Sequence, residues 1–235
     1  MDATDLVDVR GLMVRRGAFR LELPAWRVPP GQVVGVVGPN GAGKTTLLEA
    51  IAGLRPVDAG SVRVFGLDPW SRPVEVRSAL GFMSDEMALF ELRVDRLLRM
   101  VSGYYPSWDG EFAERLVERF AIDTRRKTAE LSHGQGTRLR LLLAMAFRPR
   151  LLVLDEPAAG LDLSGRRRLL ESVLDVVRDP LRSVLVSSHA LHDVERVADR
   201  VLVLSSGRVV KEGETAALVG EGRTLEEAVE AWGAA

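Results

Sequence analysis

The segment that most constrains the fold of this chain is Gly38–Thr45, which reads GPNGAGKT and fits the pattern G-x-x-x-x-G-K-[ST]. An apolar run, Gln32–Val37 (QVVGVV), precedes it, and a helical pattern over Lys44–Ala52 follows and closes at Gly53. A strand, a glycine-rich turn and a helix in this order predict one βα unit of an α/β fold. The glycines let the backbone curl, so that successive N–H groups point at one anion in front of the helix start.

This turn has the composition of a nucleotide phosphate loop. We expect nine consecutive residues to contact the nucleotide, and these are Gly38, Pro39, Asn40, Gly41, Ala42, Gly43, Lys44, Thr45 and Thr46. In such a loop the lysine, Lys44, reaches the β- and γ-phosphates, and the hydroxyl of Thr45 ligates Mg²⁺. The alternative is a glycine-rich turn that only joins a strand to a helix.

A second feature is the stretch Leu151–Pro157 (LLVLDEP), an apolar strand that ends in two adjacent acids. Two carboxylates at the end of a buried strand are costly unless they are ligated or paired. We expect Asp155 to hold Mg²⁺, directly or through water, and Glu156 to act as the general base toward water attacking the γ-phosphate. The alternative, a pair of solvated acids, is disfavoured by the phosphate loop.

His189 follows another strand pattern, SVLVSS, at its carboxyl end. Open α/β sheets place their ligand contacts at that end of the strands. We therefore expect the His189 imidazole to contact the γ-phosphate, whereas His133 and His192 are interpreted as ordinary polar residues.

The stretch Leu131–Arg138 (LSHGQGTR) predicts the start of a helix with Ser132 as its N-cap. Two glycines, Gly134 and Gly136, fall in the first turn, where each costs about 1 kcal/mol of helix stability relative to alanine. A helix start with free N–H groups is an anion site. The glycines therefore raise the question of which anion this second site serves.

Along the chain, short β-branched runs alternate with helical patterns, which predicts an α/β fold with a largely parallel sheet. The expected strands are Gln32–Val37, Ser61–Phe65, Leu80–Met83, Leu151–Leu154, Ser183–Ser187 and Val201–Leu204. The expected helices after Lys44–Ala52 are Val94–Val101, Glu111–Phe120 capped by Asp109, Gly136–Phe147 and Ser164–Val177. A hairpin near Gly207 and a tail helix with a capping box from Thr224 to Glu227 follow.

The β signal is absent between Glu86 and Arg148. We therefore expect one domain over residues 1–235, with a core lobe of about 1–85 and 149–235 and an inserted helical subdomain of about 86–148. The formal net charge of −1 argues against a general nucleic-acid binder, and the chain has no cysteine for disulfides or metal. Neither a signal peptide nor an apolar run of about 20 residues is expected to anchor it in a membrane.

Taken together, these motifs resemble the ATP-binding subunits of ABC transporters over essentially the whole chain. The phosphate loop (Walker A), LSHGQ, the LLVLDEP strand (Walker B), AGLD at Ala159–Asp162 and His189 occur in that family's order. LSHGQ is similar to the family signature LSGGQ, with His133 in place of a glycine. The resemblance implies a P-loop ABC-type domain with an N-terminal antiparallel β part, and ATP and Mg²⁺ as its ligands.

The resemblance also implies partners. Two such subunits, identical or different, pack head to tail, so Ser132, Gly134 and Gln135 would serve the γ-phosphate of an ATP held by the other chain. A separate transmembrane permease subunit would place the protein in the cytoplasm, at the inner face of the cell membrane. The segment Glu86–Val94 (EMALFELRV) would present the groove for that permease.

The chain departs from the family at two further positions. The adenine-stacking aromatic residue is replaced in VRRGAF, where Arg16 or Arg15 stands, and either an arginine plane or Phe19 is expected to meet the base. The family's glutamine near Mg²⁺ corresponds to Asp85 in LGFMSDE, so we expect Asp85 as a metal ligand; the alternative is a solvated loop acid.

The function implied is ATP hydrolysis that powers transport. The tail TLEEAVEAW resembles bacterial export ATPases, which favours export, and no added regulatory domain is expected. An ABC ATPase acting on DNA ends would carry a long coiled coil, and a ribosome-acting relative would have two tandem cassettes. A degenerate, regulatory nucleotide-binding module is the remaining alternative, because Asp85 and Arg16 are unusual.

Overall fold

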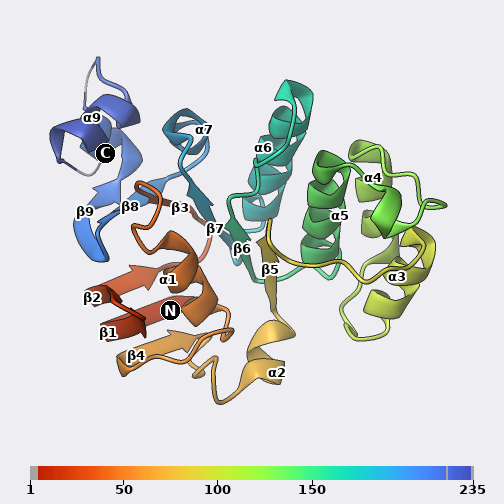
Figure 1. Ribbon diagram of the computed structural model, residues 1–235, viewed down its shortest axis with the longest axis horizontal. Coiled ribbons are helices and arrows are strands. Elements are labelled where there is room, and N and C mark those ends of the chain that lie inside the picture. The colour runs from red at the N-terminus through yellow and green to blue at the C-terminus, as the bar shows by residue number, and fades with distance from the viewer. Residues whose placement is uncertain (1–4, 221, 234–235) are drawn as a thin grey trace.

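The computed structural model describes residues 5–220 and 222–233, and this part of the chain contains one sheet with the strand order β4-β1-β2-β9-β8-β3-β7-β6-β5 (Figure 1). The strands are β1 (Val7–Arg16), β2 (Phe19–Val28), β3 (Val33–Val37), β4 (Ala59–Val64), β5 (Leu80–Ser84), β6 (Leu151–Asp155), β7 (Ser183–Ser188), β8 (Arg200–Ser205) and β9 (Arg208–Glu214). The helices are α1 (Lys44–Ile51), α2 (Pro73–Arg77), α3 (Val94–Ser102), α4 (Gly110–Arg119), α5 (His133–Met145), α6 (Leu163–Val177), α7 (Leu191–Glu195), α8 (Thr215–Val219) and α9 (Leu225–Ala231), with a 3₁₀ turn, η1 (Thr128–Glu130).

The parallel half of the sheet consists of β5, β6, β7, β3 and β8 in that order. Every residue of β3 and β6 is buried, as expected when helices cover both faces of a parallel sheet. Side chains such as Val36 and Leu185 join the core under α1. Their neighbours Val37 and Val186 point the other way, into the core under α5 and α6. The carboxyl ends of these strands therefore meet between two helical layers.

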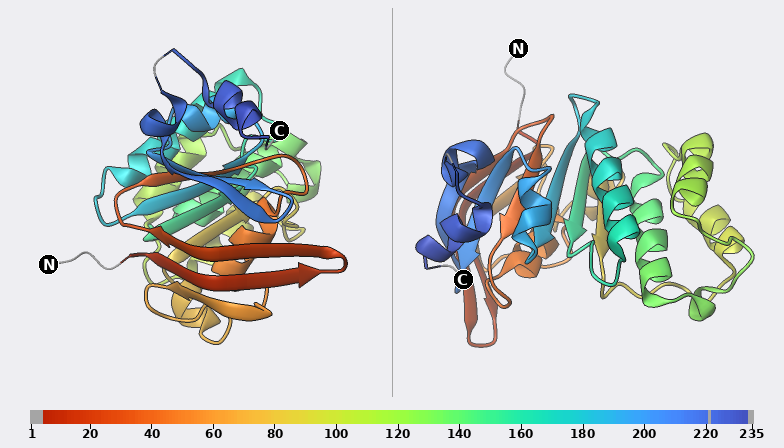
Figure 2. Two further views of the ribbon diagram at one scale, coloured as in Figure 1. Left: turned by 90° about the vertical axis from the view of Figure 1, so that its left-hand side faces the viewer. Right: turned by 90° about the horizontal axis from the view of Figure 1, so that it is seen from above.

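The antiparallel half of the sheet is built by β1, β2 and β4, and β8 and β9 form a second hairpin. Figure 2 (left) shows β1 and β2 as a long hairpin that extends past the rest of the sheet. These strands confirm the expected fold class, a mainly parallel core sheet with an N-terminal antiparallel part. The register brings Phe19, the first residue of β2, opposite Arg16, the last residue of β1.

The helices α3, α4 and α5 lie between β5 and β6 in sequence, and they gather at one end of the molecule (Figures 1 and 2). Leu139 of α5 packs with Val94 and Leu97 of α3 in a small core of its own. Between residues 86 and 148, all of them described, the β pairing is limited to one isolated bridge, Arg93 with Lys127. The predicted loss of β structure in this segment is confirmed.

The predicted elements differ from the observed ones mainly at their ends. Helix α5 begins at His133 rather than at Gly136, because Ser132 caps it: the Ser132 hydroxyl accepts from the Gln135 N–H, and the Gln135 side chain accepts from the Ser132 N–H. The cap of α4 by Asp109 and the capping box at Thr224 are confirmed. Helices α2, α7 and α8 were not predicted, because five residues each are too few to show helical periodicity.

Within the described residues, every helix is too short or too polar to cross a membrane.

Candidate functional site

The loop between β3 and α1 has a backbone that glycine makes possible. Gly38, Gly41 and Gly43 all have positive φ values, of 147°, 80° and 109°. A Cβ at Gly38 would collide with the carbonyl oxygen of Leu204. Helix α1 starts at Lys44 with no side-chain cap, so its first N–H groups remain available on the side of the loop. The loop is therefore shaped to receive an anion at a helix start.

The side chain of Lys44 is curled into this loop. Lys44 is only 6% exposed, and its Nζ donates to the carbonyl oxygens of Gly38 at 2.8 Å and Pro39 at 3.3 Å. The same Nζ lies 3.4 Å from Glu156 Oε1. The ammonium group is thus placed at the loop, in contact with the acid that follows β6.

The phosphate loop borders an open cavity of about 350 Å³. Its lining combines the loop, the start of α1, the β1–β2 turn and one Walker B acid: Arg16, Phe19, Asn40, Gly41, Ala42, Gly43, Lys44, Thr45, Thr46 and Glu156. The structure therefore brings the expected loop residues together with Arg16 and Glu156, although more than a hundred residues of sequence separate these two.

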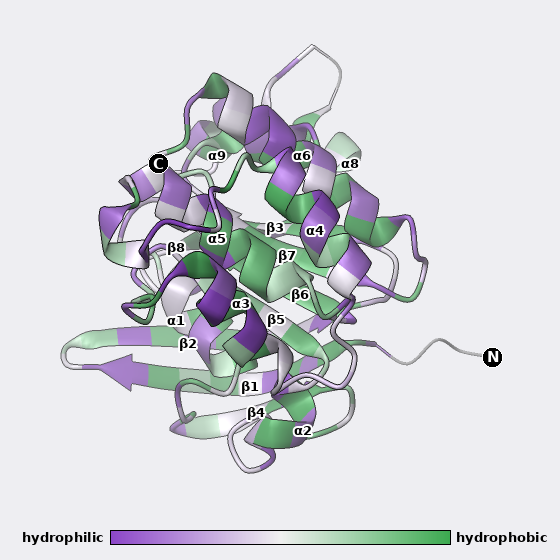
Figure 3. Ribbon diagram, turned by 90° about the vertical axis from the view of Figure 1, so that its right-hand side faces the viewer, coloured by the Kyte–Doolittle hydropathy of each residue, from purple (hydrophilic) through white to green (hydrophobic). Residues whose placement is uncertain are grey.

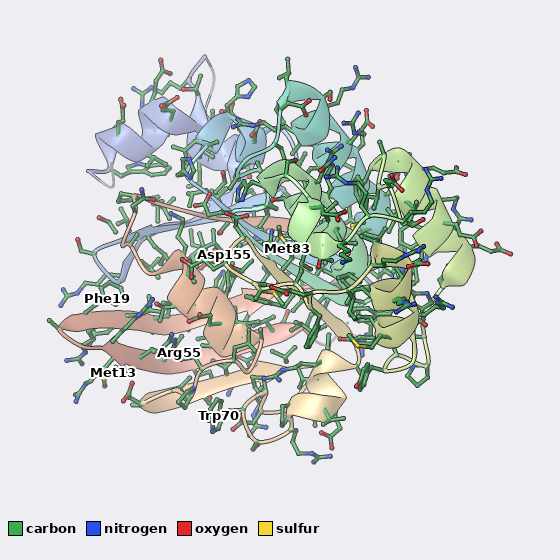
Figure 4. The ribbon with its side chains drawn as sticks, turned by 45° about the vertical axis from the view of Figure 1, so that its right-hand side comes forward. Met13, Phe19, Arg55, Trp70, Met83 and Asp155 are labelled. Carbon is green, nitrogen blue, oxygen red and sulfur yellow. The ribbon has the colours of Figure 1, made fainter. Side chains whose placement is uncertain are left out.

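Arg16 and Phe19 border the outer part of this cavity. The Phe19 ring (labelled in Figure 4) packs against the loop, since a Cβ at Gly43 would lie 3.0 Å from its Cζ. Phe19 is half-buried, whereas Arg16 is exposed. The edge of the Phe19 ring therefore packs against the loop, whereas the exposed Arg16 side chain is placed to contact a nucleotide base.

The carboxyl ends of β6 and β7 place the two acids beside a buried serine. Asp155 (labelled in Figure 4) is 4% exposed and pairs in the sheet with Ser187, which is fully buried. The Ser187 hydroxyl donates to Asp155 Oδ1 at 2.5 Å and accepts from the Glu156 N–H at 2.9 Å. Burial raises the pKa of Asp155, and hydrogen bonds from Ser187 and Thr45 oppose that rise. One hydroxyl thus connects both Walker B acids.

Glu156 joins the phosphate loop to His189. Its backbone lies in the left-handed region with φ 48°, a conformation that costs about 1 to 3 kcal/mol for a residue with a side chain. Its Oε2 lies 2.8 Å from His189 Nδ1, while Oε1 faces Lys44. The three residues predicted to be catalytic are therefore in mutual contact through Glu156.

The residues present fit a magnesium ion held together with a nucleotide. The Thr45 hydroxyl is close enough to the Asp155 carboxyl to lower its pKa, so two oxygen ligands of the kind Mg²⁺ prefers lie near each other. Among residues 5–220 and 222–233, no group of three or more His, Cys, Asp or Glu side chains is placed to hold a metal. An ion at Thr45 and Asp155 would therefore depend on phosphate oxygens and water for its remaining ligands.

The start of α5 lies apart from this cavity. Ser132 borders another hollow, formed with η1 and the segment before α3, and it does not line the cavity of the phosphate loop. Packing explains why position 134 is a glycine, which the sequence did not reveal: a Cβ there would lie 2.7 Å from the carbonyl oxygen of Gly160. Within one chain, the structure does not join Ser132, Gly134 and Gln135 to the phosphate loop.

The side chain of Asp85 contacts helix α5. Although Ser84 pairs with Asp155 in the sheet, Asp85 accepts a hydrogen bond from Thr137 of α5 at 3.3 Å. In the described part of the chain, no hydrogen bond or ion pair connects Asp85 to Thr45 or Asp155. Its role as a metal ligand stays a prediction.

Ser187 and Thr137 are two polar residues that the sequence analysis missed. Ser187 could have been noticed, because the strand pattern SVLVSS ends in two serines, Ser187 and Ser188, directly before His189. Thr137 carried no such signal, since a threonine in a helix has many ordinary explanations.

A second, apolar cavity of about 410 Å³ lies where the helical insertion meets the sheet. Its lining is Phe82, Met87, Ala88, Leu89, Phe90, Leu97, Met100, Val101, Tyr104, Tyr105, Arg140, Leu143, Ala144 and Phe147. Phe90 and Tyr104 at its rim are 68% and 76% exposed. Figure 3 looks onto this end of the molecule and shows apolar stretches of α5 behind the mixed surfaces of α3 and α4.

Comparisons with known proteins agree on one family. A family profile described as "ABC transporter" matches residues 21–159. The ABC transporter ATP-binding protein YtrB of Bacillus subtilis (strain 168) is 32% identical over 175 residues, which are 74% of this chain and 60% of the relative. The daunorubicin/doxorubicin resistance ATP-binding protein DrrA of Streptomyces peucetius is 33% identical over 222 residues, or 92% of this chain and 67% of DrrA.

Another relative is named for import. The zinc import ATP-binding protein ZnuC of Roseobacter denitrificans (strain ATCC 33942 / OCh 114) is 36% identical over 217 residues, covering 90% of this chain and 79% of ZnuC. A solved structure described as "Structure of ATP binding subunit of ABC transporter" superposes with a TM-score of 0.88 at 26% identity, over 97% of this chain and 99% of that chain.

Proposed function

The chain belongs to the ABC transporter family of ATP-binding proteins, and from that premise we propose that it hydrolyses ATP to ADP and phosphate as the energy-supplying subunit of a transporter. The observation that supports hydrolysis is the convergence of Lys44, Glu156 and His189 beside the phosphate loop. These contacts also argue against a degenerate module, because the three proposed catalytic residues of the chain are present and are connected through Glu156.

In the proposed reaction, the Glu156 carboxylate accepts a proton from the attacking water as the water oxygen bonds to the γ-phosphorus. The bond from that phosphorus to the bridging oxygen breaks, and ADP leaves with the oxygen. Lys44 exchanges its contacts with Glu156 and the Gly38 carbonyl for phosphate oxygens. His189 holds Glu156 through Nδ1. Bound Mg²⁺ would supply charge neutralisation, held by Thr45 and Asp155.

We propose that a second ATP-binding subunit, identical or different, completes each site head to tail. The support is the separation of Ser132, Gly134 and Gln135 from the phosphate loop of the same chain. An exposed helix start with a serine hydroxyl is suited to the phosphate of a nucleotide held elsewhere.

For transport, we propose a separate transmembrane permease subunit, which would hold this chain in the cytoplasm at the inner face of the cell membrane. The apolar cavity between Phe82, Phe90 and Tyr104 is the proposed docking site, because it is wide enough for apolar side chains of a permease segment and its aromatic rim is exposed. The proposed direction is export, supported by the tail from Thr224 to Trp232; transport into or out of membrane vesicles tests it.

The central experiment compares two substitutions. Glu156→Gln keeps the shape of the side chain but cannot accept the proton, so ATP should bind and persist while hydrolysis falls about 100-fold or more. Lys44→Ala should instead lose tight ATP binding. A matched control is Glu226→Gln, which changes an exposed acid on α9 and should leave hydrolysis unchanged. Turnover by Glu156→Gln at the parent rate would show that the catalytic assignment is wrong.

A mixing experiment tests the shared site. Ser132→Arg and Lys44→Ala proteins should each be inactive alone, but a mixed dimer retains one site with an intact Lys44 and an intact Ser132. Mixing should therefore restore hydrolysis. If mixtures stay inactive, and light scattering shows no dimer at saturating ATP, each site lies within a single chain.

A further inference from the structure

Asp85 and His133, two of the three residues that depart from the family pattern, lie far apart in the sequence but are neighbours in the fold. Asp85 directly follows β5, and His133 is the first residue of α5. Asp85 Oδ2 lies 3.3 Å from His133 Nε2. The two departures therefore form one contact between the end of a core strand and the start of a helix in the insertion.

Two more side chains of α5 reach the same carboxylate. The Thr137 hydroxyl lies within hydrogen-bond distance of Asp85 Oδ1, at 3.3 Å, and of the His133 carbonyl oxygen, at 3.1 Å, which share its one hydrogen. Arg140 Nη1 lies 3.7 Å from the same Asp85 oxygen. His133, Thr137 and Arg140 are spaced i, i+4 and i+7, which places them on one face of the helix. Arg140 Nε also donates to the Met87 carbonyl oxygen at 2.6 Å. This face of α5 thus holds the loop that follows β5.

The other side of His133 meets the loop that follows β6. A Cβ at Gly160 would collide with the His133 ring, and a Cβ at Gly134 would lie 2.7 Å from the Gly160 carbonyl oxygen. Thr137 approaches the Ala159 carbonyl oxygen at 3.5 Å. The first turn of α5 is therefore placed between two loops of the core, one carrying Asp85 and the other carrying Gly160.

We propose that Asp85 and His133 are a pair of positioning residues that set the orientation of the first turn of α5. Ser132 and Gly134 flank His133 directly, so the contact that holds His133 at Asp85 also limits how far the groups proposed to meet a nucleotide on the second subunit can shift. This role rests on the proposed function. It differs from the expectation that Asp85 ligates Mg²⁺, because the carboxylate oxygens that would reach an ion are instead used by α5.

The first test concerns the contact itself, in protein without nucleotide. Asp85→Asn removes the charge but keeps an oxygen for Thr137, and His133→Ala removes the ring. Amide hydrogen exchange over the first turn of α5 measures how well that turn is held. Each single variant should speed exchange. In the double variant the exchange rate should rise less than the product of the two single effects, by about threefold, as expected for two partly exposed side chains in contact.

The second test concerns the role, and it uses the Glu156→Gln protein so that bound ATP persists. Each single variant should weaken the ATP-driven dimer about threefold to tenfold in sedimentation measurements, with the double variant no weaker than the worse single. The affinity of the monomer for ATP should not change, which a general loss of folding would not reproduce. His192→Ala, at an exposed histidine outside the pair, should leave the dimer unchanged.

Three results would overturn the proposal. Purely additive effects in both measurements would show that the two residues act independently. A change in the Mg²⁺ dependence of monomer ATP affinity with Asp85→Asn but not with His133→Ala would make Asp85 a metal ligand. If the Glu156→Gln protein binds ATP but forms no dimer while hydrogen exchange still shows coupling, the shared site is wrong and the pair is only a structural contact.

Discussion

Replacing Ser187 by alanine removes one hydroxyl that two site residues share. Ser187 donates to the buried Asp155 carboxyl at 2.5 Å and accepts from the Glu156 N–H at 2.9 Å. A buried group left without its partner costs about 1 to 3 kcal/mol. The Glu156 N–H is only partly buried and can turn to water, so the total loss of stability should be about 2 to 3 kcal/mol.

The same change should affect turnover more than folding. The Ser187 hydrogen bond opposes the rise that burial causes in the pKa of Asp155, so its loss raises that pKa further and weakens the carboxylate as a magnesium ligand. Glu156 also loses a contact that holds its left-handed backbone, and displacement of a catalytic group by about 1 Å costs about 100-fold in rate. We expect ATP hydrolysis per folded molecule to fall about 10- to 100-fold.

Ser183→Ala is the matched control, since Ser183 is equally buried at the opposite end of β7. Its hydroxyl likewise donates once, to the Pro29 carbonyl oxygen at 2.9 Å, and accepts once, from the Gln32 N–H at 3.2 Å. Urea unfolding should show similar losses of stability for both variants. Steady-state phosphate release, measured well below their melting temperatures, should fall in Ser187→Ala but not in Ser183→Ala. Equal hydrolysis by the two variants would refute the assignment of Ser187 to the site.

Three more predictions follow from the same geometry. Gly38→Ala should lower the melting temperature and abolish ATP binding in titrations, because its Cβ collides with the Leu204 carbonyl oxygen. Gly66→Ala, also at a positive φ but in open space, should cost only about 1 kcal/mol. Arg16→Ala should weaken ATP binding about fivefold without changing tripolyphosphate affinity, because the guanidinium is expected to meet the base. Because burial raises the pKa of Asp155, the folded metal-free protein keeps that proton to higher pH than the unfolded chain, and stability falls as pH rises through this interval. In EDTA, Asp155→Asn should therefore melt above the parent at neutral pH and converge with it near pH 3, where both states of the parent are protonated.

The local features of this protein follow from short stretches of its sequence. The phosphate loop Gly38–Thr45, the acids after β6 and the caps at Ser132 and Asp109 depend on neighbouring residues, so their patterns predict both the structure and much of the candidate site. The absence of β patterns between residues 86 and 148 likewise predicted the helical insertion. Family resemblance supplied the rest of the expected site, including residues that one chain alone does not bring together.

Other features were decided only by the packing of distant segments. Ser187 reaches Asp155 because the register of β6 on β7 places them side by side, and no pattern within either strand specifies that register. The Asp85 carboxylate contacts His133 and Thr137 because α5 packs against the end of β5, and no sequence pattern specifies that packing. Side-chain partners of this kind depend on non-local packing, which a linear sequence pattern does not record.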